Sequence, residues 1–135
     1  MSYQFSTAAR NASLDAVEAT IGTSAILRIR TGSAPANCGT ADSGTVIATL
    51  TLPSDWLANA ASGAKAMSGT WQDLSADAAG TAGHFRIYDS AGTTCHIQGT
   101  CTITGSGGDM TIDNPTLTLG QQFSVTSFSI TAGGA

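Results

Sequence analysis

The side chains that could take part in acid–base, nucleophilic or metal chemistry are few in this sequence. Its 135 residues include two histidines, three cysteines and nine acidic residues, and only Glu18 among the acids is a glutamate. A hydrolase or transferase needs a nucleophile and an acid–base group held within hydrogen-bonding distance of each other. The chain has no GxSxG, P-loop or HExxH pattern that would place such groups. We therefore expect a protein that is not an enzyme and that has no cofactor.

The two histidines come nearest to forming a metal or catalytic site. His84 and His96 fall on two segments that we expect to pair as a hairpin, where they could approach each other. Cys101 or Asp89 would complete a minimal metal site, and an enzyme would need the histidines to converge with Asp89 or Glu18. Their spacing matches no pattern of zinc ligands, and cross-strand polar pairs on a solvent face are common. We therefore expect no metal site.

The three cysteines show no CxxC spacing and are odd in number. Cys95 and Cys101, six residues apart, would lie about 20 Å apart on one strand and could pair only across a turn. Without a secretory signal, a disulfide framework is not indicated. We expect Cys38, Cys95 and Cys101 to be small packing residues.

Two further patterns have a functional and a structural interpretation. The GSGGD segment at 105–109 loosely resembles a calcium-binding glycine repeat, but it occurs once and we expect a flexible hairpin loop. Four aromatic residues could form a sugar-binding platform: Tyr3, Trp56, Trp71 and Tyr88. The stronger expectation is that the tryptophan pair fills the core.

Composition and charge exclude several classes of partner. Only 10% of the residues are charged, the net charge is -4, and Ala, Thr, Gly and Ser make up 73 of the 135 residues. Nucleic-acid binding requires clustered Lys and Arg, and the pair Arg28 and Arg30, which we expect on the solvent side of a strand, is too small a cluster. A surface made up mainly of small hydroxyl and methyl groups loses its water at a low free-energy cost, which favours contacts with other protein chains.

No membrane partner or targeting segment is indicated by the pattern of hydropathy. No window approaches the ~18 uninterrupted apolar residues of a membrane helix. The N-terminus has neither a charged nor an apolar leader region, so we expect synthesis in the cytoplasm without targeting.

Residues 6–21 are the only good candidate for a helix. Ser6 or Thr7 can cap its start and Gly22 can end it. Its apolar side chains recur at helical spacing along one face, at Leu14, Val17 and Ile21.

Beyond Gly22 the hydrophobic period changes to two, which indicates strands. We expect strands within 25–31, 45–52, 64–70, 84–88, 94–104, 110–112, 116–119 and 122–131, with 84–88 and 94–104 paired as a hairpin. No crossover helices separate them. The sequence therefore predicts one domain, 1–135, with an N-terminal arm and helix (1–21) and an antiparallel β-sandwich or jelly roll (22–135).

Three stretches carry a resemblance to a known family: STAARNASLDAVEATIGTSAILRIRTGSAPANCGTADSGTVIATLTLP, GTAGHFRIYDSAGTTCHIQGT and GGDMTIDNPTLTLGQQFSVTSFSITAGGA. They resemble a family of short proteins encoded among the virion genes of tailed phages, with the least similarity over 56–80. Size, strand pattern and small-residue surface are similar to capsid decoration (cement) proteins. The resemblance implies a structural protein on the capsid exterior, made in the host cytoplasm. Its implied partners are the major capsid protein and further copies of itself, as a homodimer or homotrimer.

Two other roles stay open: another virion component, such as a tail or head-tail connector protein, and a carbohydrate-binding module on the particle surface. For a cement protein we expect an uncharged contact surface that includes residues 1–5 and the helix. Edge strands could add main-chain hydrogen bonds to a neighbour's sheet. The candidate interface residues are Tyr3, Phe5, Leu14, Arg28 and Arg30.

Overall fold

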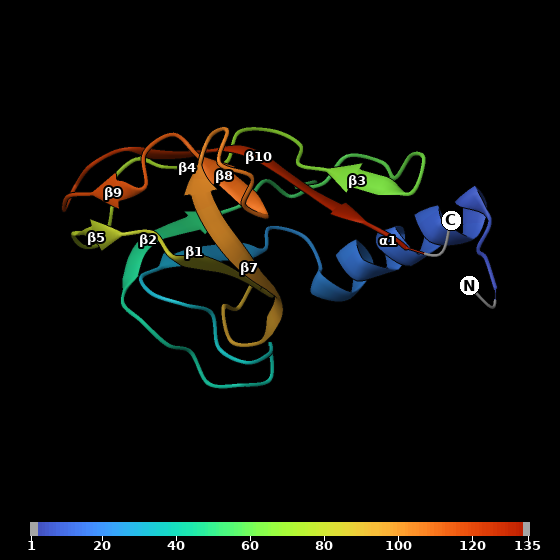
Figure 1. Ribbon diagram of the computed structural model, residues 1–135, viewed down its shortest axis with the longest axis horizontal. Coiled ribbons are helices and arrows are strands. Elements are labelled where there is room, and N and C mark those ends of the chain that lie inside the picture. Colours follow the sequence, from blue (N-terminus) through green and yellow to red (C-terminus); the bar gives the residue numbers. More distant parts are fainter. Residues whose placement is uncertain (1–2, 134–135) are drawn as a thin grey trace.

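The computed structural model, which describes residues 3–133, is a curled β-sheet structure with a helix at one end (Figure 1). The described elements are α1 (Thr7–Ile21), β1 (Ile26–Arg30), β2 (Val46–Thr51), β3 (Ala64–Ala66), β4 (Gln72–Asp73), β5 (Gly80–Thr81), β6 (His84–Tyr88), β7 (Cys95–Ile103), β8 (Met110–Ile112), β9 (Thr116–Leu117) and β10 (Phe123–Thr131). The predicted fold class, mostly β and sandwich-like with one N-terminal helix, is confirmed.

The helix begins and ends where its capping residues predict. The Oγ of Ser6 accepts a hydrogen bond from the Ala9 amide at 3.1 Å. Gly22, at a φ of 93°, donates its amide to the Glu18 carbonyl at 2.8 Å, which closes the last turn. This left-handed conformation favours glycine at the end of a helix. Leu14 and Ile21 are buried on the inner face of α1.

The main sheet has the strand order β2-β1-β6-β7-β8-β10-β3, with β4 also paired to β10. All its pairs are antiparallel except β7 with β8, and the predicted hairpin of β6 and β7 is confirmed. A small second sheet pairs β5 with β9.

The parallel pairing of β7 and β8 corrects the prediction of a hairpin loop at 105–109. The segment that contains these glycines folds back beside β7, where the Gly108 amide donates to the Thr102 Oγ1 at 2.9 Å. The chain then turns again and enters β8 in the direction of β7. A Cβ at Gly108 would lie 2.6 Å from Thr102 Oγ1, so the close return requires a glycine.

The core lies inside the curl and contains both tryptophans. The ring centroids of Trp56 and Trp71 are 6.0 Å apart, and those of Trp71 and Phe128 are 5.7 Å apart. Each indole nitrogen donates to a main-chain carbonyl, Trp56 to Gly22 at 2.9 Å and Trp71 to Ser68 at 3.0 Å. The prediction that the tryptophan pair fills the core is confirmed, and no sugar-binding platform can be built from it.

The outer edge of β2 is covered by residues of its own chain. The Asp77 amide donates to the Ile47 carbonyl at 2.8 Å, and the Thr49 amide donates to a carboxylate oxygen of Asp73 at 3.0 Å. These two main-chain groups are therefore already paired and would not take part in strand addition at β2.

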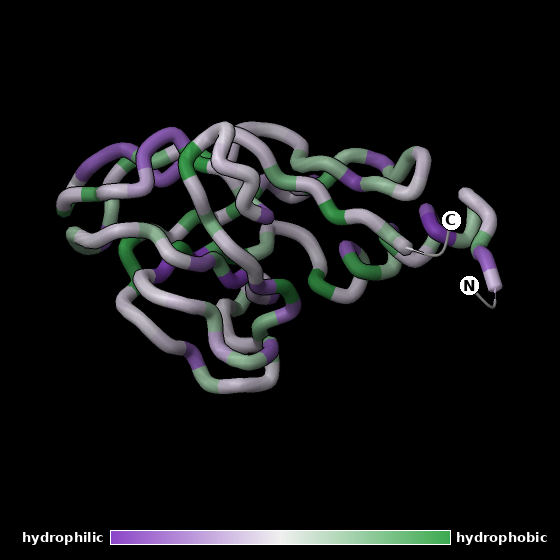
Figure 2. Tube along the Cα trace, viewed as in Figure 1, coloured by the Kyte–Doolittle hydropathy of each residue, from purple (hydrophilic) through white to green (hydrophobic). Residues whose placement is uncertain are grey.

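The helix, β3 and the end of β10 together form an extension at one end of the molecule (Figure 1). Much of the chain trace is pale in the hydropathy colouring of Figure 2, as the high content of Gly, Ser and Thr requires. Short strongly hydrophilic segments interrupt it, in keeping with the 10% of residues that are charged.

Candidate functional site

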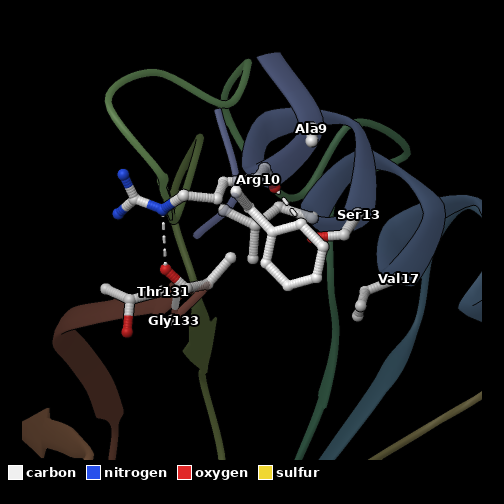
Figure 3. Close-up of a pocket in the computed structure, with 9 residues that line it drawn as sticks. Ala9, Arg10, Ser13, Val17, Thr131 and Gly133 are labelled. Atoms are coloured by element: carbon white, nitrogen blue, oxygen red, sulfur yellow. Dashed lines mark hydrogen bonds between the residues drawn. The ribbon is translucent and has the colours of Figure 1, made fainter. Parts of the chain in front are cut away.

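A groove of about 400 Å³ lies between α1 and the last described residues of the chain (Figure 3). It is lined by Phe5, Ala9, Arg10, Ser13, Leu14, Val17, Thr131, Ala132 and Gly133. Most of this lining is small or apolar, and none of it is acidic. The groove is therefore suited to apolar side chains of another molecule.

Polar contacts hold the helix against the segment before β3 and the residues that follow β10. The Nε of Arg10 donates to the Ala132 carbonyl at 3.0 Å, a contact visible in Figure 3. The Oδ1 of Asn11 accepts from the Gly63 amide at 2.9 Å, and the Gly63 carbonyl in turn accepts from the Ala132 amide at 2.9 Å. These bonds link α1, the segment before β3 and the end of β10.

A buried ion pair fixes the middle of the helix. Lys65 on β3 is 3% exposed, and its Nζ lies 2.8 Å from an oxygen of Asp15 and 3.0 Å from one of Glu18. Burial alone would lower the pKa of Lys65, but the hydrogen bonds and charges of the two carboxylates outweigh it, and the pKa is raised. The second oxygen of Glu18 accepts from the Leu57 amide at 3.2 Å. The helix is thus part of the folded body rather than a detached arm.

Large apolar side chains are exposed beside the groove. Tyr3 is 67% exposed, Phe5 50% and Val17 36%. The rings of Tyr3 and Phe5 meet edge to face, with centroids 5.3 Å apart. We call these three residues, together with the groove, the helix patch.

The structure brings together only part of the predicted interface. Tyr3 and Phe5 belong to the helix patch, and Leu14 lies at the base of the groove with 4% of its surface exposed. The predicted arm also included Met1 and Ser2, which lie outside the described residues. The exposure of Val17 is not predictable from the sequence, because helical spacing alone places it with Leu14 on the buried face.

Arg28 and Arg30 lie elsewhere; the prediction that they face solvent is wrong for Arg30, and Arg28 is half-buried. The loop of residues 31–45 folds over that face of the sheet, and Asp42 in the loop pairs with Arg30 at 3.0 Å. Arg30 is 7% exposed. Arg28 donates to the Gly92 carbonyl at 3.0 Å and lies 4.7 Å from the centre of the Tyr88 ring. Both guanidinium groups thus have partners within the chain.

Arg86, which the sequence did not single out, organises this covered face. It is 1% exposed, pairs with Asp42, and donates to the main-chain carbonyls of Cys38 at 2.9 Å and Thr40 at 3.1 Å. Burial would raise the pKa of Asp42, but the hydrogen bond from Tyr88 and the nearby guanidinium groups hold it below its usual value. These contacts bind the loop to the sheet.

The two histidines do not converge. His84 is fully buried opposite Thr100, and its Nδ1 lies 2.9 Å from the Gly32 carbonyl. His96 instead lines a hollow beside α1. Within residues 3–133 no cluster of three or more His, Cys, Asp or Glu side chains could hold a metal ion.

Comparison with known proteins yields no relative. No family model, no curated protein and no solved structure matches this chain. In the part of the chain that the structure describes, α1 is too short and too polar to cross a membrane.

Proposed function

We propose that this chain is a non-enzymatic structural protein of a virus particle, a capsid decoration protein on the outer shell of a tailed-phage head that also binds a second copy of itself. The sequence resemblance to virion proteins supports the particle context. The helix patch supports assembly with protein. Besides a second copy of itself, the proposed partner of the chain is the major capsid protein.

The observation that carries the proposal is the exposure of Tyr3, Phe5 and Val17 beside an apolar groove. Hydrating the apolar surface of an aromatic side chain is unfavourable in free energy, so covering that surface with a partner is favourable. Removing about 100 Å² more of each aromatic side chain from water, at about 25 cal/mol per Å², contributes roughly 2.5 kcal/mol per ring. That gain must still exceed the entropic cost of association.

The proposed occupant of the groove is the helix patch of a second copy. A two-fold contact needs a surface that is complementary to itself. The helix patch has both parts: Tyr3 is a highly exposed ring that lies outside the groove lining, and the groove is the hollow beside it. The net charge of -4 opposes self-association in general, but no acidic side chain lines this groove.

The carbohydrate-binding alternative has lost its main support, because both tryptophans are buried. A tail or head-tail connector protein is a rival within the same particle, since it too would assemble with copies of itself. The number of copies on a particle separates these two roles, because decoration covers the whole shell and a connector forms a single ring.

The self-association is tested by light scattering of the purified chain after size-exclusion chromatography. We expect a dimer, and a shift to monomer in Val17→Asp, which places a carboxylate in the groove. The matched control is Leu119→Asp, because Leu119 is 74% exposed and does not line the groove. A wild-type monomer at high concentration, or equal loss of dimer in both variants, would overturn the assignment of the helix patch.

A further inference from the structure

Cys38 and Cys95 lie against each other, although they are far apart in sequence. Both line a cavity of about 380 Å³ between the loop 31–45 and the β6–β7 hairpin. The two thiols are close enough for Cys38 to raise the pKa of Cys95, and each residue is half-buried. Cys101, by contrast, is buried in the core and does not line this cavity.

One guanidinium group holds both cysteines in place. The Nε of Arg86 donates to the Cys95 Sγ at 3.1 Å, and its Nη2 donates to the Cys38 carbonyl at 2.9 Å. The Cys95 thiol also donates to the Ile97 carbonyl at 3.4 Å. Because Arg86 is almost completely buried, it fixes the two main-chain segments at a defined separation.

The loop that carries Cys38 has no helix or strand of its own. It runs from β1 to β2, and its main anchor is Asp42, which contacts Arg30, Arg86 and Tyr88. A loop of this length without secondary structure is uncommon in a small domain unless something holds it. A covalent bond at Cys38 would add a second anchor beside the ionic one.

We propose that Cys38 and Cys95 form an intramolecular disulfide when the chain meets an oxidising environment, and that this bond locks the loop 31–45 onto the sheet. Cys38 and Cys95 are then a redox-active pair and not merely packing residues, whereas Cys101 remains a thiol in the core.

The chemistry is two successive thiol–disulfide exchanges with a small-molecule disulfide as oxidant. The Cys38 thiolate attacks one sulfur of the oxidant, a mixed disulfide forms, and one small-molecule thiolate leaves. The Cys95 thiolate then attacks the Cys38 sulfur of the mixed disulfide, and the second small-molecule thiolate leaves. Two protein thiols lose two electrons and two protons, and the oxidant is reduced to two thiols.

Cys95 is suited to the second, intramolecular step. Burial and the neighbouring Cys38 thiol raise the pKa of Cys95 to about 11, although Arg86 opposes the shift. At neutral pH Cys95 is therefore mostly a thiol and reacts slowly with reagents in solution. The intramolecular step is nevertheless favoured, because Cys95 is held close to Cys38 and the two groups therefore have a high effective concentration.

The test is oxidation of the purified wild-type chain with oxidised glutathione, followed by non-reducing peptide mapping and mass spectrometry. We expect a Cys38–Cys95 cross-linked peptide, a mass loss of about 2 Da per chain, and reduced Cys101. The matched control Cys101→Ser closes the same bond. Glutathione adducts without a cross-link, a bond to Cys101, or a bond between chains would overturn the proposal.

The melting temperature tests separately whether the bond locks the loop. A disulfide that closes this long stretch of chain raises the melting temperature by about 10 °C in the wild type and in Cys101→Ser. Cys38→Ser, treated in the same way, shows no such rise. A cross-linked chain that melts within about 2 °C of the reduced chain would contradict the claim that the bond locks the loop.

Discussion

Replacing Lys65 by Met is the sharpest perturbation of the contact that holds α1 in place. The substitution keeps most of the side-chain volume and removes the charge that pairs with Asp15 and Glu18. Breaking a buried ion pair from one side costs about 3–5 kcal/mol. Asp15 is 59% exposed and regains water, so we reduce the expected loss to about 2–3 kcal/mol, mostly from Glu18.

The assay is urea unfolding followed by circular dichroism, in a double-mutant cycle with Glu18→Gln. Lys65→Met should lower the free energy of unfolding by about 2–3 kcal/mol and the melting temperature by roughly 10 °C. The double variant should lose less than the sum of the two single losses, because the neutral amide no longer needs a cation. Additive losses, or a loss below about 0.5 kcal/mol for Lys65→Met, would refute the account of the ion pair.

The same ion pair predicts a pH dependence. The folded-state pKa of Lys65 is raised above 10.5, so its contribution to stability is fully present below that pH. It is lost as the pH rises through the folded pKa, and the wild type and Lys65→Met should therefore converge in stability at strongly alkaline pH. A gap between them that stays constant through that range would contradict the charge-based explanation.

Three further outcomes follow from the covered face and the close return of the chain. Asp42→Asn should lower the free energy of unfolding by about 1–3 kcal/mol at pH 7, measured by urea unfolding, because it weakens the anchor of the loop to Arg86. Since the pKa of Asp42 is lowered in the folded state, the stability it contributes is present above pH 3.8 and is lost as the pH falls further, so the variant and the wild type should converge in acid. Gly108→Ala should cost about 1–3 kcal/mol by thermal unfolding, because its Cβ would collide with Thr102, whereas Gly133→Ala has open space and should change stability little.

Much of the fold could be predicted because local signals agree with it. Ser6 and Gly22 mark the ends of the helix through their capping chemistry, and the alternating apolar residues of 84–88 and 94–104 indicate a hairpin. The size and apolar character of the tryptophans predict that they lie in the core. These features depend on near neighbours along the chain, which is why one sequence suffices to find them.

The covered face could not be predicted, because it depends on contacts between distant segments. Arg28 and Arg30 alternate with apolar residues, a pattern typical of a solvent-exposed face. Nothing local indicates that the loop 31–45 returns across it, or that Asp42 and Arg86 meet there. The contact of Cys38 with Cys95 arises from the same long-range packing.

The register of the hairpin explains why the two histidines do not meet across it. His84 lies opposite Thr100, so His96 is displaced along β7 by four residues from the facing position. Sequence alternation predicts which face a residue occupies, but it does not fix which residues stand opposite each other. Part of the helix patch could be predicted from the sequence, because Tyr3 and Phe5 lie just before the N-cap Ser6, in the segment expected to contact another chain.

The number of copies of this chain on a purified particle tests the central claim most directly. Stained-gel densitometry against the major shell protein gives that ratio, and labelling with an antibody to this chain gives its position. A decoration protein predicts a copy number of the same order as the shell protein, with label over the whole head surface. Absence from the particle, or a small fixed number of copies confined to the tail or its junction with the head, would contradict the account.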